Sequence, residues 1–250
     1  MNCFDKGQAA AWWMAAVAAI VLSDPSSARA ISLEQKQAEL DLRHVWNFDK
    51  DAVGTLPPGF IPAQMGAGPA GEWKVESDQT APSGPHRLSQ TASCPGGCFH
   101  LLLADGLVYD YVDVTTRFRA LTAGATGAGT GGLVFRYRDA KNFYAAVIDL
   151  AASSLEVVKV TDGQVQGLAM EPVKPSPSPW HYLRVKHDTI LSKDAMEVWF
   201  DGKIIFSTWD KERFGGQIGL VSKGTGPLGF DNIHAIRLYS QHPLSPPAAY

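Results

Sequence analysis

Five side chains combine planar guanidinium groups with aromatic rings, two residue types suited to binding sugars. Sugars present apolar C–H faces beside dense hydroxyl groups, so their sites pair an aromatic platform with planar hydrogen-bond donors. The candidate ligand-binding residues are Arg136, Arg138, Tyr144, Arg184 and Trp209. The competing interpretation is structural: the two hairpin arginines would form a solvated strand face, and Tyr144 and Trp209 would be half-buried packing residues.

Three of these residues lie in one predicted hairpin, GGLVFRYRDAKNFYAAVIDL, residues 131–150. Its side chains alternate on both sides of an Asp-Ala-Lys-Asn turn, which predicts two strands. A period of two places Arg136 and Arg138 on one face, opposite Phe135 and Tyr137. If that face lies on a concave sheet, alanine variants of either arginine should fold normally and lose ligand binding.

Short alternating segments continue along the rest of the chain, separated by Gly, Pro, Asn and Asp. This pattern predicts an all-β sandwich or barrel with almost no helix. Asp162-Gly163 and Asp201-Gly202 are typical two-residue hairpin turns. Gly219 suits a strand that packs closely against a neighbour. The candidate strands are residues 44–48, 73–76, 87–90, 99–103, 112–118, 133–138, 143–150, 155–160, 181–187, 196–200, 203–207, 217–221 and 233–238; residues 54–72, 122–132 and 171–179 are expected to be loops.

The strand at residues 112–118 shows how alternation separates the two faces. Val112, Val114, Thr116 and Phe118 form the predicted inward set, which leaves Arg117 and its alternate neighbours on the other face. We expect His181 and His187 at the surface rather than as catalytic bases.

Two cysteines, Cys94 and Cys98, flank a Pro-Gly-Gly turn in SCPGGCF. Glycine allows the tight backbone that brings the two Cβ atoms together, so an exported chain should form a small, locally acting disulfide here. A zinc site that includes His100, or a haem attachment, is the alternative. The spacing C-x-x-x-C-F-H differs from the haem motif, and a fourth zinc ligand is missing nearby.

Composition limits the classes of partner. The 250 residues carry a formal net charge of −3, and no run of Lys/Arg is long enough to follow a phosphate backbone. We therefore do not expect nucleic-acid binding.

The N-terminus has the pattern of a secretory signal peptide. Residues 9–22 form an apolar run of 14 residues, and Ala28-Arg29-Ala30 fits an A-x-A cleavage site. The run is shorter than the ~20 residues that span a bilayer. We expect residues 1–30 to be removed and the mature protein to be periplasmic or extracellular, without a membrane partner. An uncleaved anchor is the alternative.

The order of the segments resembles a known superfamily. GGLVFRYRDAKNFYAAVI, VVKVTDG, WHYLRV, MEVWFDGKIIF, GGQIGLVSKG and FDNI together look like the concanavalin A-like lectin/glucanase superfamily. Within it, the chain is similar to laminin-G-like domains of exported bacterial proteins, some classed as 3-keto-disaccharide hydrolase domains. The resemblance implies a jelly-roll sandwich of two antiparallel sheets, one concave, with ligands at the concave face or its rim.

That resemblance carries architecture rather than activity. The catalytic glucanases of the superfamily place alternate carboxylates on an E-x-D-x-E strand, which this chain lacks. Glu197 and Asp201 are the nearest pair, but Asp201 belongs to a hairpin turn. No catalytic residue is therefore assigned, and whether the chain is an enzyme is left open.

Calcium is the one cofactor that the resemblance suggests. The segment from Asp49 to Gly54 begins like an EF-hand loop, but Val53 and Phe60 occupy ligand positions of that loop. Sandwiches of this superfamily can hold structural calcium, which gives Asp49, Asp51 and Asp231 as candidate ligands. Capping and turn hydrogen bonds are the alternative role for these residues.

The sequence thus predicts a signal peptide (1–30), a polar leader (31–43), one concanavalin A-like domain (44–240) and a Pro-rich tail (241–250). The expected function is non-catalytic binding of carbohydrate or another polar ligand. A glycoside-processing hydrolase of the 3-keto-disaccharide type and a protein-interaction module of the laminin-G type are the alternatives. The oligomeric state is left open.

Overall fold

A computed structural model describes residues 42–122, 129–190, 193–210 and 215–238. The predicted signal peptide, most of the leader and the Pro-rich tail lie outside these ranges. The strands are β1 (Arg43–Trp46), β2 (Phe60–Met65), β3 (Trp73–Ser77), β4 (His86–Gln90), β5 (Phe99–Tyr109), β6 (Tyr111–Ala120), β7 (Thr130–Asp139), β8 (Asn142–Asp149), β9 (Ser154–Thr161), β10 (Gln164–Pro172), β11 (His181–Ile190), β12 (Lys193–Phe200), β13 (Lys203–Asp210), β14 (Gly216–Lys223) and β15 (Leu228–Leu238).

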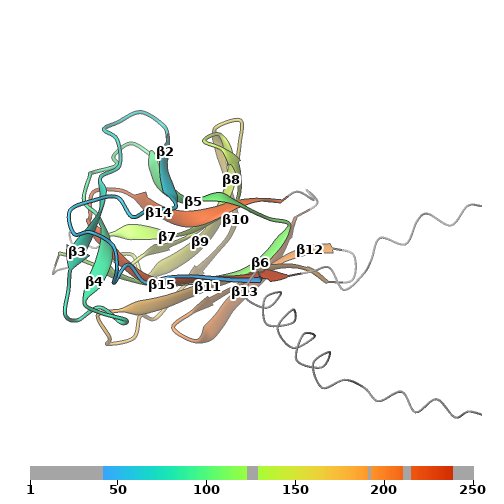
Figure 1. The fold of residues 1–250 in the computed structure, drawn as a ribbon. Coiled ribbons are helices and arrows are strands. Elements are labelled where there is room, and N and C mark those ends of the chain that lie inside the picture. The colour runs from blue at the N-terminus through green and yellow to red at the C-terminus, as the bar shows by residue number, and fades with distance from the viewer. Residues whose placement is uncertain (1–41, 123–128, 191–192, 211–214, 239–250) are drawn as a thin grey trace, which may run out of the picture. The chain divides into compact units, whose positions relative to one another are not determined.

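Two antiparallel sheets stack face to face (Figure 1). Sheet A has the order β13-β12-β11-β6-β15-β4-β3, and β1 also pairs with β15. Sheet B has the order β10-β9-β8-β7-β14-β5-β2. Strands distant in sequence are neighbours, such as β6 with β15 and β7 with β14. The predicted all-β jelly-roll sandwich is confirmed, and no described helix is long and apolar enough to cross a membrane.

The main hydrophobic core fills the space between the sheets. The inward set predicted for residues 112–118 is confirmed, because Val112, Val114, Thr116 and Phe118 are all buried. Phe118 packs against Phe230 of the neighbouring strand, with ring centroids 6.4 Å apart. Burial of such rings supplies most of the driving force that holds the layers together.

A second buried apolar cluster lies on the opposite face of sheet B. In β8, Tyr144, Ala146 and Ile148 belong to the main core, whereas the alternate residues Phe143, Ala145 and Val147 belong to the second cluster. Sheet B therefore buries apolar side chains on both faces, so its strands read as continuous apolar runs rather than as a clean alternation.

The predicted turn chemistry is also confirmed. Asp162, Gly163, Asp201 and Gly202 all have positive φ values, between 48° and 80°. Two successive residues with positive φ are typical of the tight turn that matches the twist of a hairpin.

Two strands escaped the sequence analysis, β2 and most of β10. Both lie at the edges of sheet B. β2 contains Pro62, which an edge strand tolerates because only one side of it needs paired N–H groups. β10 is largely exposed, so it lacks a buried face that would produce alternation.

Candidate functional site

Arg136 is not on a solvated strand face, which corrects the prediction for the hairpin. A register irregularity between Phe135 and Asp139 and a φ of 52° at Arg136 turn its side chain into the protein. Only 1% of Arg136 is exposed, and its Nη2 donates to Asp194 Oδ2 at 3.1 Å. A bulge inserts residues into one strand and so reverses the faces that simple alternation assigns.

The five predicted ligand-binding residues are therefore not one set. Tyr144 is fully buried and its hydroxyl donates to Asp210. Arg138 is exposed at the end of β7 in sheet B. Arg184 and Trp209 lie on sheet A, where Trp209 is 48% exposed. Only these last two share a surface.

Arg136 and Tyr144 instead belong to an interior charge cluster that joins the two sheets. Asp194 and Asp210 lie directly opposite each other on β12 and β13. Two like charges in that position repel, but each carboxylate has a cation from sheet B: Arg136 for Asp194, and Lys159, at 3.1 Å, for Asp210. The cluster thus holds sheet A to sheet B by paired charges.

His187 borders this cluster and is 1% exposed, not at the surface as expected. Neither ring nitrogen has a hydrogen-bond partner in the described part of the chain, and Nε2 is 3.8 Å from Asp194 Oδ2. Burial lowers the pKa of His187, and the nearby charge of Arg136 adds to this effect. His187 is therefore neutral at neutral pH.

The free energy of unfolding should consequently fall as the pH is lowered from about 7.5 to about 5.5. In the unfolded chain, His187 has a pKa of ~6.5 and binds a proton as the pH falls below that value. Native His187 stays neutral there, so protonation favours the unfolded state and the free energy of unfolding decreases. His234, whose pKa is lowered by burial and by Arg43, acts in the same direction. Urea unfolding at the two pH values measures the loss. A His187→Phe variant should show a shallower dependence, and an unchanged slope would contradict this role.

The outer face of sheet A carries a row of stacked arginines and aromatic rings. The Cζ atoms of Arg117, Arg119 and Arg184 lie 4.8, 5.4 and 4.5 Å from ring centroids. The rings belong to Tyr182, Trp180 and Trp199 respectively. We call these six residues the arginine–aromatic face.

Strand register places these partners together. Arg117 lies directly opposite Tyr182 across β6 and β11, and Arg184 lies directly opposite Trp199 across β11 and β12. Residues directly opposite in antiparallel strands point to the same face. Since the alternate residues Phe118 and Leu183 enter the core, the stacked residues must face outward. Each guanidinium–ring stack contributes about 0.5–1 kcal/mol at an exposed site.

Arg184 is the most tightly held of the three arginines. Its Nε donates to Asp113 Oδ1 at 2.7 Å and its Nη2 donates to Oδ2 of the same carboxylate. This hydrogen-bonded pairing raises the pKa of Arg184 further above its usual value. The guanidinium is thus fixed in orientation over Trp199, with Nη1 directed away from the bidentate pair.

Exposed apolar side chains extend this surface onto the edge strand β13. Ile204, 54% exposed, lies opposite Trp199, and Trp209, 48% exposed, lies opposite Ala195. An exposed indole provides a flat apolar surface for the C–H face of a sugar. The predicted residues Arg184 and Trp209 are therefore at the centre and the edge of one surface.

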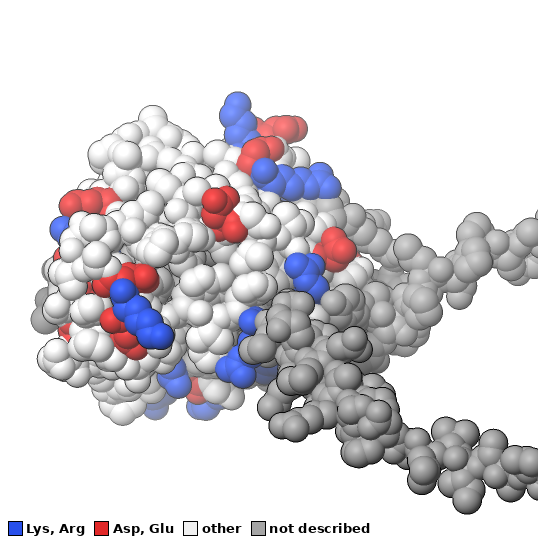
Figure 2. Space-filling model, viewed as in Figure 1, with Lys and Arg blue, Asp and Glu red and all other residues white. Residues whose placement is uncertain are grey.

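Charge on the face seen in Figure 2 is mixed in sign. Lys/Arg and Asp/Glu residues lie mostly side by side in small groups, separated by broad uncharged areas. This face shows no continuous basic stripe.

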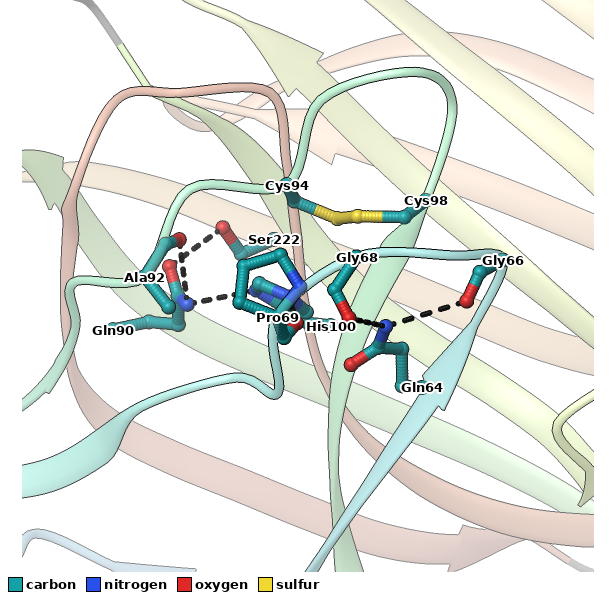
Figure 3. Close-up of a disulfide and its surroundings, with 10 residues drawn as sticks. All are labelled: Gln64, Gly66, Gly68, Pro69, Gln90, Ala92, Cys94, Cys98, His100 and Ser222. Atoms are coloured by element: carbon teal, nitrogen blue, oxygen red, sulfur yellow. Dashed lines mark hydrogen bonds between the residues drawn. A yellow bond between two sulfur atoms is a disulfide. The ribbon is translucent and has the colours of Figure 1, made fainter.

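The predicted disulfide between Cys94 and Cys98 is present, with the Cα atoms 5.4 Å apart (Figure 3). The sulfur atoms lie near His100, so a three-ligand cluster does form. His100, however, is bonded at both nitrogens: Nδ1 to the Gln90 amide and Nε2 to the Pro69 carbonyl oxygen, each at 2.9 Å. With its sulfurs joined and its imidazole occupied, the cluster is a structural support for the loop before β3.

The three candidate calcium ligands are only partly assembled. Asp231 is fully buried, and its pKa is raised by burial and by the nearby charge of Asp49. Both Asp231 oxygens already accept hydrogen bonds from Ser83, and Oδ1 also accepts from the Asn232 N–H. Within the described ranges, the Asp51 carboxylate shares no hydrogen-bond partner with Asp231. The donor set as it stands does not fit calcium, which needs six to eight free oxygens.

The Glu197 and Asp201 pair is not a catalytic dyad. Asp201 occupies its turn and accepts hydrogen bonds from the N–H groups of Ser176 and Tyr182. It also pairs with His181 Nδ1 at 3.0 Å, and His181 is buried rather than exposed as predicted. The acidic partner of His181 thus comes from the following hairpin turn, beyond its sequence neighbours.

Comparison with known proteins identifies the fold. No protein-family model and no curated protein matches the sequence. Among solved structures, the carbohydrate-binding module CBM66 from Bacillus subtilis has a TM-score of 0.56 at 16% identity, covering 71% of this chain and 95% of that one. The exoplasmic/lumenal domain of VIP36, in a Ca²⁺/Man3GlcNAc-bound form, has a TM-score of 0.52 at 12% identity, covering 80% and 93%.

The chain shares the two-sheet jelly-roll sandwich fold of these solved structures. A variant of the GH43 protein BlXynB from Bacillus licheniformis also resembles the chain, with a TM-score of 0.50 at 13% identity, covering 78% of this chain and 39% of that one. Identities this low establish the jelly-roll architecture and leave the ligand to be argued from the surface.

Sequence analysis missed four members of the arginine–aromatic face: Arg117, Arg119, Tyr182 and Trp199. The usable signal was the outward alternation of Arg117 in β6 and of Tyr182 and Arg184 in WHYLRV. Their juxtaposition depends on β6 pairing with β11, which no local pattern specifies.

Proposed function

We propose that the chain is a non-catalytic carbohydrate-binding domain of an exported protein and that it binds glycans on the arginine–aromatic face. The observation that carries the proposal is the row of three guanidinium–ring stacks on adjacent strands of one sheet face. The partly exposed rings of Tyr182 and Trp199 offer apolar area, whereas Trp180 is 7% exposed and supports Arg119 from below. The guanidinium groups offer several donors, so a sugar finds both kinds of contact within one surface.

The structural neighbours support the same class of ligand. The solved structures with the same fold include a protein named as a carbohydrate-binding module and a domain described with bound Man3GlcNAc. The signal-peptide pattern at residues 1–30 supports export, which is where extracellular glycans are met.

A hydrolase is less well supported by the geometry. The opposed carboxylates Asp194 and Asp210 lie in the interior, each paired with a cation of sheet B. A general acid or nucleophile must reach the scissile bond, and these two groups are held within the sandwich. Turnover assays run beside the binding measurements test this point, and release of a sugar product would overturn the non-catalytic assignment.

Glycan-array binding of the mature protein, followed by titration of the best glycan, tests the site. Arg184→Ala should weaken affinity ten- to a hundredfold, because loss of a charge-assisted donor costs about 1.5–3 kcal/mol. Trp199→Ala should also weaken it, because it removes the ring over which the Arg184 guanidinium is held. Lys141→Ala removes an exposed cation from the β7–β8 turn of sheet B and is the matched control. Full affinity in both sheet A variants would contradict the site, and absence of any bound glycan would contradict the function.

A further inference from the structure

Most charged groups on the outer face of sheet A have an ion-pair partner. Arg184 holds Asp113, and Lys186 lies 3.2 Å from Asp188. At the other end of the face, Arg87 holds Asp78 at 2.6 Å. These pairs neutralise one another and leave little net attraction for an external charge.

Arg117 is different, although it lies in the same row. Within the described ranges, no carboxylate oxygen lies within 4.0 Å of its guanidinium, and its recorded contact is the stack on Tyr182. Asp231 is its direct neighbour on β15, but both oxygens of that carboxylate are bonded to Ser83. Arg117 is thus a half-exposed cation whose hydrogen-bonding groups face solvent.

Arg119 adds a second donor group two residues along β6. Its Nη1 donates to Thr80 Oγ1 at 3.0 Å and lies 3.6 Å from Asp78, a carboxylate that Arg87 already holds more closely. Its Nε is buried without a hydrogen-bond partner. Two residues of a strand span about 6.7 Å, so two oriented guanidinium groups stand side by side.

The guanidinium groups of Arg117 and Arg119 together suit an anion with several acceptor oxygens, such as the two coplanar oxygens of a carboxylate or the three terminal oxygens of a sulfate ester. Stacking on Tyr182 and Trp180 fixes the guanidinium planes, so little rotamer entropy is lost when their N–H edges bind. Carboxylate and sulfate groups accept guanidinium donors in pairs, at roughly twice the strength of neutral hydrogen bonds.

We propose that the glycan bound by this face is anionic, with a uronate carboxylate or a sulfate ester held by Arg117 beside Arg119. This inference rests on the proposed function and adds the chemical class of the ligand. Because the whole chain carries a net charge of −3, the selectivity arises from these two groups and not from a general attraction.

Paired glycans that differ only in charge test the inference. Oligogalacturonate is compared with its methyl ester, and a sulfated galactan oligosaccharide with its desulfated form, by calorimetry at low and moderate salt. We expect at least one anionic member to bind ten- to a hundredfold more tightly than its neutral counterpart. The pair that shows this preference distinguishes carboxylate from sulfate.

Arg117→Gln should abolish the preference for the anionic member of each pair, whereas Arg117→Lys should keep only part of it. Lys141→Gln is the matched control, and thermal unfolding checks that each variant is folded. Equal affinity for charged and neutral members, with binding still lost in Trp199→Ala, would overturn this inference alone. A wild-type protein that binds no glycan, charged or neutral, would overturn the proposed function as well.

Discussion

Replacing Arg136 with methionine should lower the free energy of unfolding by about 3–5 kcal/mol, because Asp194 would remain buried without its cation. Both side chains are 1% exposed, and the Arg136 guanidinium also lies 4.7 Å from the centroid of the Tyr144 ring. Urea unfolding at neutral pH measures the loss. The expectation of an exposed, readily replaced arginine at this position no longer applies.

Removing both charges tests whether the effect comes from the pair. The double variant Arg136→Met/Asp194→Leu should recover most of the lost stability, since well-packed apolar residues often substitute for a buried ion pair at little cost. Arg138→Met, two residues away and exposed, should change stability by no more than about 0.5 kcal/mol. A single variant as stable as the wild type would show that the interior pair is dispensable.

Replacing Gly219 with alanine should lower the free energy of unfolding by about 3 kcal/mol or more. A Cβ at this position would meet the carbonyl oxygen of Leu102 well inside 3.0 Å and would lie 2.8 Å from its carbonyl carbon. These are backbone atoms of β5, the strand paired with β14, so the two strands would have to separate. Thermal and urea unfolding together report the loss, and the predicted close packing of this glycine is confirmed.

Gly167→Ala is the matched control because Gly167 lies in the exposed edge strand β10. The nearest atom to its added Cβ is the flexible Glu156 carboxylate at 3.1 Å. Its stability should stay within about 0.5 kcal/mol of the wild type. Equal losses in the two glycine variants would show that steric contact with β5 is not the cause.

The strands and turns were predictable because their signals are local. Alternation in β6 and the Asp201-Gly202 turn depend on residues a few positions apart. The bulge that turns Arg136 inward was not predictable, since it depends on how β7 pairs with β8 and β14. Period two alone assigns Arg136 to the wrong face.

The sequence predicted which types of residue the candidate site contains, but not which of them lie next to one another. Arg184 and Trp209 were identified from chemistry, and both lie on the outer face of sheet A. Their companions Arg117 and Tyr182 are ordinary outward residues until β6 and β11 are paired. Which guanidinium retains an unpaired charge depends on Glu76 in β3, Asp78 just after it and Asp231 in β15, which are far apart in sequence.

The pairing of β1 with β15 determines how this sandwich can be connected to other proteins. Arg43 lies directly opposite Ile236, so the first and last described strands enter and leave at neighbouring points, about 5 Å apart. Residues 43–238 could therefore be inserted into a loop of a host protein whose two cut ends lie little more than one strand spacing apart. Linkers at the two junctions can be short, and a circular permutant that joins these points would preserve the order of both sheets.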